Sequence, residues 1–160
     1  MRGSGSVDFE KRLEELGISL PQPARPVAAY VPAVQAGAWV YISGQLPSVG
    51  GVVKTTGKLG AEVTVEEGYQ AARLCAINAM AALKAVIGDL NRVERIVKVT
   101  GFVASADSFT KQPAVINGCS ELLKAIFGEA GSHARTSVGV AELPLGAAVE
   151  VEMIVQLRSG

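Results

Sequence analysis

The sequence predicts an α+β domain in which one β-sheet carries two long helices on a single face. Three observations lead to this class. Segments 64–87 and 113–127 repeat apolar residues at helical spacing, whereas segments 39–43, 93–103 and 149–157 alternate apolar and polar residues as strands do. The chain has 160 residues, of which 49% are hydrophobic, and this is enough for one core. The predicted order is strand, strand, strand, helix, strand, helix, strand, strand.

The first part of the chain predicts an extension, residues 1–24, ahead of one domain, residues 25–158. Residues 1–6 have the composition of an expression-vector remnant and lack the apolar core of a secretory signal. Segment 8–17 places its apolar residues at helical spacing and ends in glycine, so it predicts a short appended helix. Segment 20–26 contains three prolines, which favour an extended connection.

Two strands, residues 27–35 and 39–43, are predicted next, joined by a hairpin turn at residues 36–38. In the second strand the even positions are aliphatic, whereas Trp39 and Tyr41 point to the other face. A glycine-rich loop follows and predicts one more short strand near residues 52–55.

The two long helices have clear start signals. Thr64 and Glu67 have the spacing of a capping box, and the helix that they begin continues to about Ile87. The second helix, residues 113–127, has a proline in its first turn, where the missing amide costs nothing. Segment 93–103 lies between them and predicts a strand.

The last part of the chain, residues 134–157, predicts a β-hairpin. From Val149 the odd positions are apolar, so Glu150 points away from the core. In the preceding strand Val138 and Val140 alternate with polar residues. Pro and Gly between the two segments are typical of a turn.

We expect Val138, Val140 and the odd apolar positions from Val149 to face the core. The opposite face of the hairpin then carries Arg135, Ser137 and Glu150. The planar guanidinium of Arg135 matches a carboxylate, and Glu150 could orient or activate a water molecule. This interpretation predicts a site for a small anionic substrate. The alternative is a cross-strand Arg135–Glu150 pair with a structural role only.

The sheet face away from the helices is predicted to carry mixed apolar and charged side chains that no further element covers. A homo-oligomer that packs these faces together would bury the apolar members and leave the charged ones in clefts between subunits. The residues assigned to this face are Trp39, Tyr41, Phe102, Arg135, Glu150 and Ile154.

Charge and hydropathy exclude several classes of partner. Fifteen Lys and Arg balance fifteen Asp and Glu, and this neutral total predicts no nucleic-acid partner. The sequence contains no apolar run of about 18 residues, which is the length that would predict a membrane span. With no signal segment, the expected location is cytoplasmic.

No metal or cofactor is predicted. His133, the only histidine, is interpreted as a loop residue and cannot form a histidine cluster within one chain. Cys75 and Cys119 lack metal-ligand spacing and are expected to be buried thiols.

Four blocks of sequence together resemble the reactive-intermediate deaminase superfamily, the Rid or YjgF group, also labelled L-PSP endoribonuclease-like. Their order and spacing carry the resemblance, which spans about residues 25–157. The blocks are 30–34, 42–47, 97–102 and 134–152.

The resemblance implies a chorismate-mutase-like fold, a homotrimer with sites between subunits, and hydrolysis of reactive enamines or imines to 2-keto acids and ammonia without a cofactor. It implies that Arg135 binds the substrate carboxylate and that Glu150 holds the attacking water. The other site residues that it implies are Tyr30, Ser43, Gly44, Asn117 and Ser137.

The chain departs from the family pattern at Ala28 and Ala29, where a glycine and a proline are common, and at Ser137, where many relatives have cysteine. Three functions are therefore compared. The first is the imine deaminase; the second is a non-catalytic protein that binds a small carboxylate metabolite in the same cleft. The third is an endoribonuclease or translation inhibitor, which the neutral charge and the single histidine disfavour.

Overall fold

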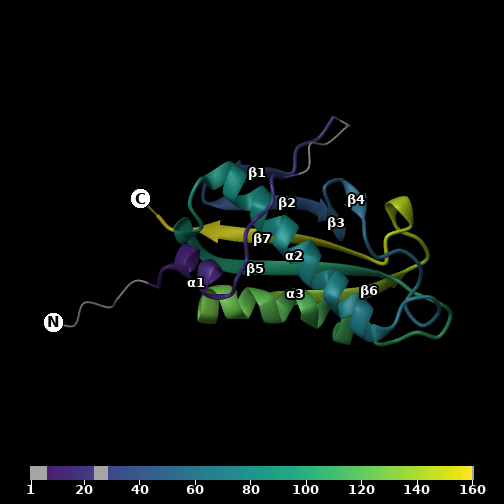
Figure 1. The fold of residues 1–160 in the computed structure, drawn as a ribbon. Helices are drawn as coiled ribbons and strands as arrows, with labels where there is room; N and C mark the ends of the chain where they lie inside the picture. The colour runs from purple at the N-terminus through teal and green to yellow at the C-terminus, as the bar shows by residue number, and fades with distance from the viewer. Residues whose placement is uncertain (1–6, 24–28, 160) are drawn as a thin grey trace.

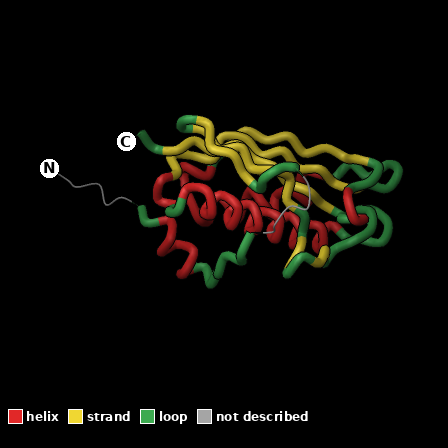
Figure 2. Tube along the Cα trace, turned by 90° about the horizontal axis from the view of Figure 1, so that it is seen from above, coloured by secondary structure: helices red, strands yellow, loops and turns green. Residues whose placement is uncertain are grey.

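The structure, a computed structural model, describes residues 7–23 and 29–159. A five-stranded sheet forms one layer and two long helices form the second, both on the same face of the sheet (Figures 1 and 2). The predicted α+β class with a chorismate-mutase-like arrangement is confirmed. Ala28 lies outside the described residues.

The main sheet has the order β1-β2-β7-β5-β6. Strands β5 and β6 are parallel, and the other neighbouring pairs are antiparallel. The prediction of a terminal hairpin is wrong, because β5 lies between β6 and β7 (Figure 1). The connection after β6 carries the chain across β5 instead of turning back beside β6. The strands are β1 (Ala33–Ala36), β2 (Trp39–Gln45), β5 (Val93–Ala104), β6 (Ala134–Val140) and β7 (Val149–Leu157).

The helices α2 (Val65–Ile87) and α3 (Gln112–Phe127) cover the sheet. The predicted capping box is present: the Thr64 side chain accepts from the Glu67 amide and the Glu67 carboxylate accepts from the Thr64 amide. The helices approach closely, since a Cβ at Gly118 would lie 1.9 Å from the Tyr69 carbonyl oxygen. Helix α2 is long and apolar enough to cross a bilayer. It packs between α3 and the sheet, and this packing explains why so many of its residues are apolar.

Register fixes which side chains of β6 and β7 face the helices. In β7 the odd residues are buried beneath the helices, as predicted, and Glu150 points to the open face. In β6 the prediction is wrong: Val138 lies on the open face, because it pairs with Phe102 of β5, which pairs in turn with Glu150 of β7. Arg135 and Ser137 point toward α3, because β6 is an edge strand whose helix-side positions are only half buried and therefore tolerate polar side chains.

The short elements complete the domain. Helix α1 (Phe9–Glu15) ends earlier than Gly17 and is packed into the core, where the Phe9 and Phe127 rings meet edge to face at 4.8 Å. The boundary between residues 24 and 25 stays a prediction. Strand β1 begins at Ala33, later than the predicted start. A small hairpin, β3 (Ser48–Val49) and β4 (Val52–Val53), and the 3-10 turns η1 (Leu90–Arg92), η2 (Gly128–Gly131) and η3 (Pro144–Gly146) make up the rest.

Candidate active site

Arg135 lies at the edge of the sheet beneath α3, and both hydrogens of one terminal nitrogen have acceptors. Its Nη1 donates to Asn117 Oδ1 at 2.8 Å and to Ser120 Oγ at 3.2 Å. Within residues 7–23 and 29–159, no carboxylate forms an ion pair with this guanidinium. Arg135 is half-buried, so its charge is only partly hydrated and is not compensated by the fold. Such a group is suited to binding an anion.

Ser120 and His133 continue this network. Ser120 Oγ lies 2.9 Å from His133 Nε2, and His133 Nδ1 lies 2.7 Å from the Gly131 carbonyl oxygen. Burial, together with the neighbouring Arg135 charge, lowers the pKa of His133 below its ordinary value, although the Gly131 hydrogen bond acts in the opposite direction. His133 is therefore neutral near pH 7, and its interpretation as an ordinary loop residue misses these contacts.

A cavity of about 300 Å³ opens beside the guanidinium. Its walls come from the end of α3, the η2 turn and the start of β6. The lining combines two cationic side chains with a neutral imidazole, two hydroxyls and a glycine, which favours an anionic occupant. The lining residues are Ser120, Lys124, Gly131, Ser132, His133 and Arg135.

Ser137 lies two residues beyond Arg135 on the same side of β6. Its hydroxyl oxygen is buried and has no hydrogen-bond partner in the described part of the chain. A buried hydroxyl without a partner costs free energy, so Ser137 is a strained polar position beside Arg135. Asn117, Arg135 and Ser137, all predicted as site residues, thus lie in one region.

Glu150 lies on the other face of the sheet. A Cβ at Gly44 would lie 2.2 Å from Glu150 Oε1, so the carboxylate packs directly on the backbone at the irregular end of β2. Burial, with a smaller contribution from the Glu152 charge, raises the pKa of Glu150 above its ordinary value. A carboxylate with a raised pKa is a better proton acceptor at neutral pH, which is the property required of a general base.

Ser43 precedes Gly44 in β2, and its hydrogen bonds reach the segment that carries Tyr30. The Ser43 hydroxyl donates to the Val31 carbonyl at 2.7 Å, and its amide donates to the Pro32 carbonyl at 2.8 Å. Both donors of Ser43 therefore hold the segment that precedes β1. Tyr30, on that segment, is exposed. A cavity of about 290 Å³ on this face is lined in part by Tyr41, Ser43 and Glu152.

The expectation that Arg135 and Glu150 share one face is wrong within a single chain. Arg135 pairs with Val99 and Glu150 pairs with Phe102, and an odd separation along β5 places the two side chains on opposite faces. The predicted site residues therefore form two groups, here named the arginine group (Asn117, Arg135 and Ser137) and the glutamate group (Tyr30, Ser43, Gly44 and Glu150).

Sequence reasoning missed Ser120 and His133 as partners of Arg135. The signal was available, because Ser120 follows Asn117 by three residues on one helix face and His133 precedes Arg135 by two residues. No cluster of three metal-ligating side chains occurs among the residues that the structure places.

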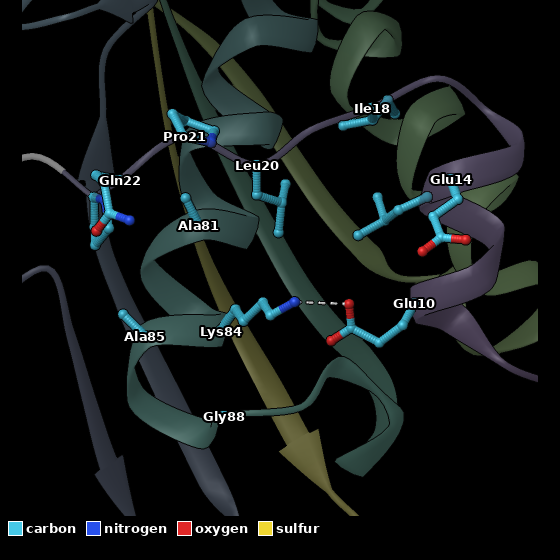
Figure 3. Close-up of a pocket in the computed structure, with 12 residues that line it drawn as sticks. Glu10, Glu14, Ile18, Leu20, Pro21, Gln22, Ala81, Lys84, Ala85 and Gly88 are labelled. Carbon is cyan, nitrogen blue, oxygen red and sulfur yellow. Dashed lines mark hydrogen bonds and ion pairs between the residues drawn. The ribbon is translucent and has the colours of Figure 1, made fainter.

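A separate cavity of about 430 Å³ lies between α1, residues 18–23 and α2 (Figure 3). Two of its three charged side chains form an ion pair: Lys84 Nζ lies 2.9 Å from Glu10 Oε2, and the other Glu10 oxygen accepts from the Leu90 amide. The third charged side chain is Glu14. None of the predicted site residues lines it. The ion pair between Lys84 and Glu10 joins α1 to the domain.

Comparison with known proteins assigns the family. Residues 10–157 match the profile described as "YjgF/chorismate mutase-like, putative endoribonuclease". The chain belongs to the YjgF superfamily. Protein TCP17 of Trypanosoma cruzi is 51% identical over 150 residues, which cover 92% of each chain. A 2-iminobutanoate/2-iminopropanoate deaminase of Dermatophagoides farinae is 34% identical over 88% of this chain and 95% of its own.

Solved structures of YjgF relatives share the fold. A protein of unknown function from Agrobacterium tumefaciens has a TM-score of 0.86 at 45% identity, with 94% of each chain covered. E. coli TdcF, whose structure holds bound serine, has a TM-score of 0.59 at 27% identity and covers 89% of this chain and 96% of its own. The recognition of the Rid/YjgF superfamily from sequence is confirmed.

Proposed function

We propose that this protein hydrolyses small 2-imino acids, or their enamine tautomers, to 2-keto acids and ammonia. The observation that carries the proposal is Arg135, a half-buried guanidinium with neutral protein acceptors and a cavity beside it. An imino acid carries a carboxylate, and a carboxylate is the anionic partner that the Arg135 guanidinium lacks among the described residues. Two relatives support the substrate class: one is named as an imine deaminase, and another was solved with bound serine, a small amino acid.

The reaction needs one base and one water molecule. Arg135 holds the carboxylate, which places the imine carbon at a fixed distance from the sheet. Glu150 accepts a proton as the water oxygen bonds to the protonated imine carbon, and a carbinolamine forms. Glu150 then returns that proton to nitrogen, and the carbon–nitrogen bond breaks as ammonia leaves. The hydroxyl proton passes to Glu150 and from there to ammonia, so that the products are the 2-keto acid and an ammonium ion. No cofactor takes part in these steps.

Two copies of the chain are needed to assemble this site, since Arg135 and Glu150 lie on opposite faces of one sheet. We propose a homotrimer in which the arginine group of one subunit meets the glutamate group of the next. The open face offers apolar surface for this contact, because Trp39, Tyr41 and Val138 are 41%, 51% and 40% exposed.

Subunit complementation tests the proposal. An Arg135→Ala chain and a Glu150→Gln chain are each expected to keep about a hundredth or less of the wild-type activity alone. The two variants are denatured, mixed in equal amounts and refolded together. About a quarter of the shared sites should then hold both native residues, and ammonia release should recover to about a quarter of the wild-type rate. Each variant refolded without the other is the control. Absence of recovery in mixed oligomers would show that one chain supplies both groups.

The second candidate is a non-catalytic protein that binds a small carboxylate metabolite through Arg135. It predicts that the melting temperature rises with the logarithm of the 2-ketobutyrate concentration above the Kd, while no 2-imino acid is turned over. The cytoplasmic location and the absence of nucleic-acid partners are part of the proposal. The endoribonuclease alternative predicts RNA cleavage by the wild-type protein that Arg135→Ala abolishes.

A further inference from the structure

We propose that Ser120 and His133 are positioning residues that fix the plane of the Arg135 guanidinium for a two-point contact with the substrate carboxylate. This inference rests on the proposed function and concerns how the arginine group is held. Neither residue is among those that the family resemblance implies. Both act through Arg135 and take no part in the chemical steps.

The chain of hydrogen bonds permits one arrangement of protons. The Gly131 carbonyl can only accept, so His133 Nδ1, at 2.7 Å, carries the hydrogen. In a neutral imidazole the other nitrogen, Nε2, is then an acceptor, and the Ser120 hydroxyl donates to it at 2.9 Å. The remaining lone pairs of Ser120 Oγ accept from Arg135 Nη1 at 3.2 Å. The backbone carbonyl of Gly131 therefore sets the direction of every bond in the relay.

This relay leaves a defined edge of the guanidinium for a ligand. Nη1 has two hydrogens, and Asn117 Oδ1 and Ser120 Oγ accept both. The Nε and Nη2 hydrogens form the parallel pair that a carboxylate accepts in a bidentate contact. No protein acceptor for them occurs among residues 7–23 and 29–159. Without the relay, the guanidinium could rotate about its last bonds and lose this edge.

The surroundings keep the relay in its neutral form. Arg135 comes from β6, Lys124 of α3 lines the same cavity, and Arg95 of β5 donates to the Ser132 carbonyl at 2.9 Å. These charged groups near His133 are all cations, and no carboxylate bonds to its ring in the part of the chain that the structure places. A proton on Nε2 would add a further positive charge and remove the acceptor that Ser120 needs.

Nuclear magnetic resonance tests the relay without any ligand. His133 is the only histidine of the sequence, so every imidazole signal belongs to it. We expect nitrogen shifts of the Nδ1–H tautomer near pH 7, and slow rotation of the Arg135 side-chain groups that becomes fast in His133→Leu. An Nε2–H tautomer, or unchanged Arg135 rotation in His133→Leu, would overturn the proposal.

Binding of 2-ketobutyrate, measured by calorimetry, provides the second test. His133→Leu and Ser120→Ala should each raise the Kd about tenfold, the effect of one hydrogen bond to a charged group. The double variant should be no weaker than either single variant, because both remove the same relay. His133→Gln, which places an amide oxygen near the Nε2 position, should restore most of the affinity.

Thr110→Ala is the control, since it removes an exposed hydroxyl ahead of α3 that lies outside both the cavity and the relay. Wild-type affinity in His133→Leu, or additive losses in the double variant, would contradict a shared positioning role. If instead Arg135→Ala binds 2-ketobutyrate as tightly as the wild type, the proposed function fails, and the resonance experiment alone decides the relay.

Discussion

The arginine group and the glutamate group differ in how the fold treats their charges. Arg135 is held by neutral oxygens of two α3 side chains, on the helix side of an edge strand. Glu150 lies on the open face of the central part of the sheet, against the backbone at Gly44 and near the like charge of Glu152. Each group has the charge that the other lacks, and the sheet separates them. In the proposed function each group is half of a site, and the following variants test the two halves separately.

Arg135→Ala has the largest expected effect. Loss of a charge-assisted, two-point contact should reduce kcat/KM for a 2-imino acid by about a thousandfold. Thermal stability should change little, because Arg135 has no ion pair within residues 7–23 and 29–159. Ammonia release and melting temperature are measured on the same preparation. A large fall in stability with modest loss of activity would assign Arg135 a structural role.

Glu150→Gln should separate catalysis from stability. We expect kcat to fall about a hundredfold while the Kd for 2-ketobutyrate changes little. The folded state raises the pKa of Glu150, so its favourable contribution is present below the unfolded pKa and is lost as pH rises through the folded pKa. At pH 7 the substitution should therefore stabilise the fold by less than about 1 kcal/mol, since solvent screens the half-exposed group. A destabilised variant would contradict this assignment.

Gly44→Ala tests whether the position of the Glu150 carboxylate matters for catalysis. The new methyl group would overlap Glu150 Oε1, so the flexible side chain must move and kcat should fall about tenfold. In a Glu150→Ala background the same substitution should have no further effect on the residual rate, because the overlap is gone. Additive losses would show that Gly44 acts through the backbone of β2 and not through Glu150.

The smallest expected effect is on the pH dependence of stability. Because the folded state lowers the pKa of His133, its contribution is present above its unfolded pKa near 6.5 and is lost as pH falls through the folded value. Between pH 7 and pH 5 the wild type should lose more stability than His133→Gln, by less than about 1 kcal/mol. Denaturant unfolding at several pH values measures the difference. Identical slopes would show that His133 is protonated equally in both states.

The sequence predicts the elements better than their pairing. The capping box at Thr64 and the alternation of β7 depend on neighbours in sequence, and both are found. The pairing of β6 depends on β5, more than thirty residues away, and no local pattern distinguishes a hairpin from a crossover. The two valines of β6 also mislead, since an edge strand can point apolar side chains away from the helices. Arg135 was therefore assigned to the wrong face although its residue type was informative.

The sequence names the candidate site residues but not their division into two groups. Asn117 and Arg135 are in direct contact, as their shared assignment requires. Glu150 and Gly44 touch as well, which spacing along the sequence could not show. The roles of these residues stay proposals. That they occupy opposite faces follows from the register of three strands, which only the structure supplies.

The two thiols of the chain are held where small electrophiles cannot reach them. Cys75 on α2 and Cys119 on α3 are buried, and burial raises the pKa of both, that of Cys119 to about 12. Only a thiolate adds readily to an activated double bond, and neither side chain ionises at physiological pH. A catalyst of enamine breakdown with this interior would not be alkylated by its own substrate. Position 137, on the helix side of β6 near Arg135, carries a hydroxyl and no thiol.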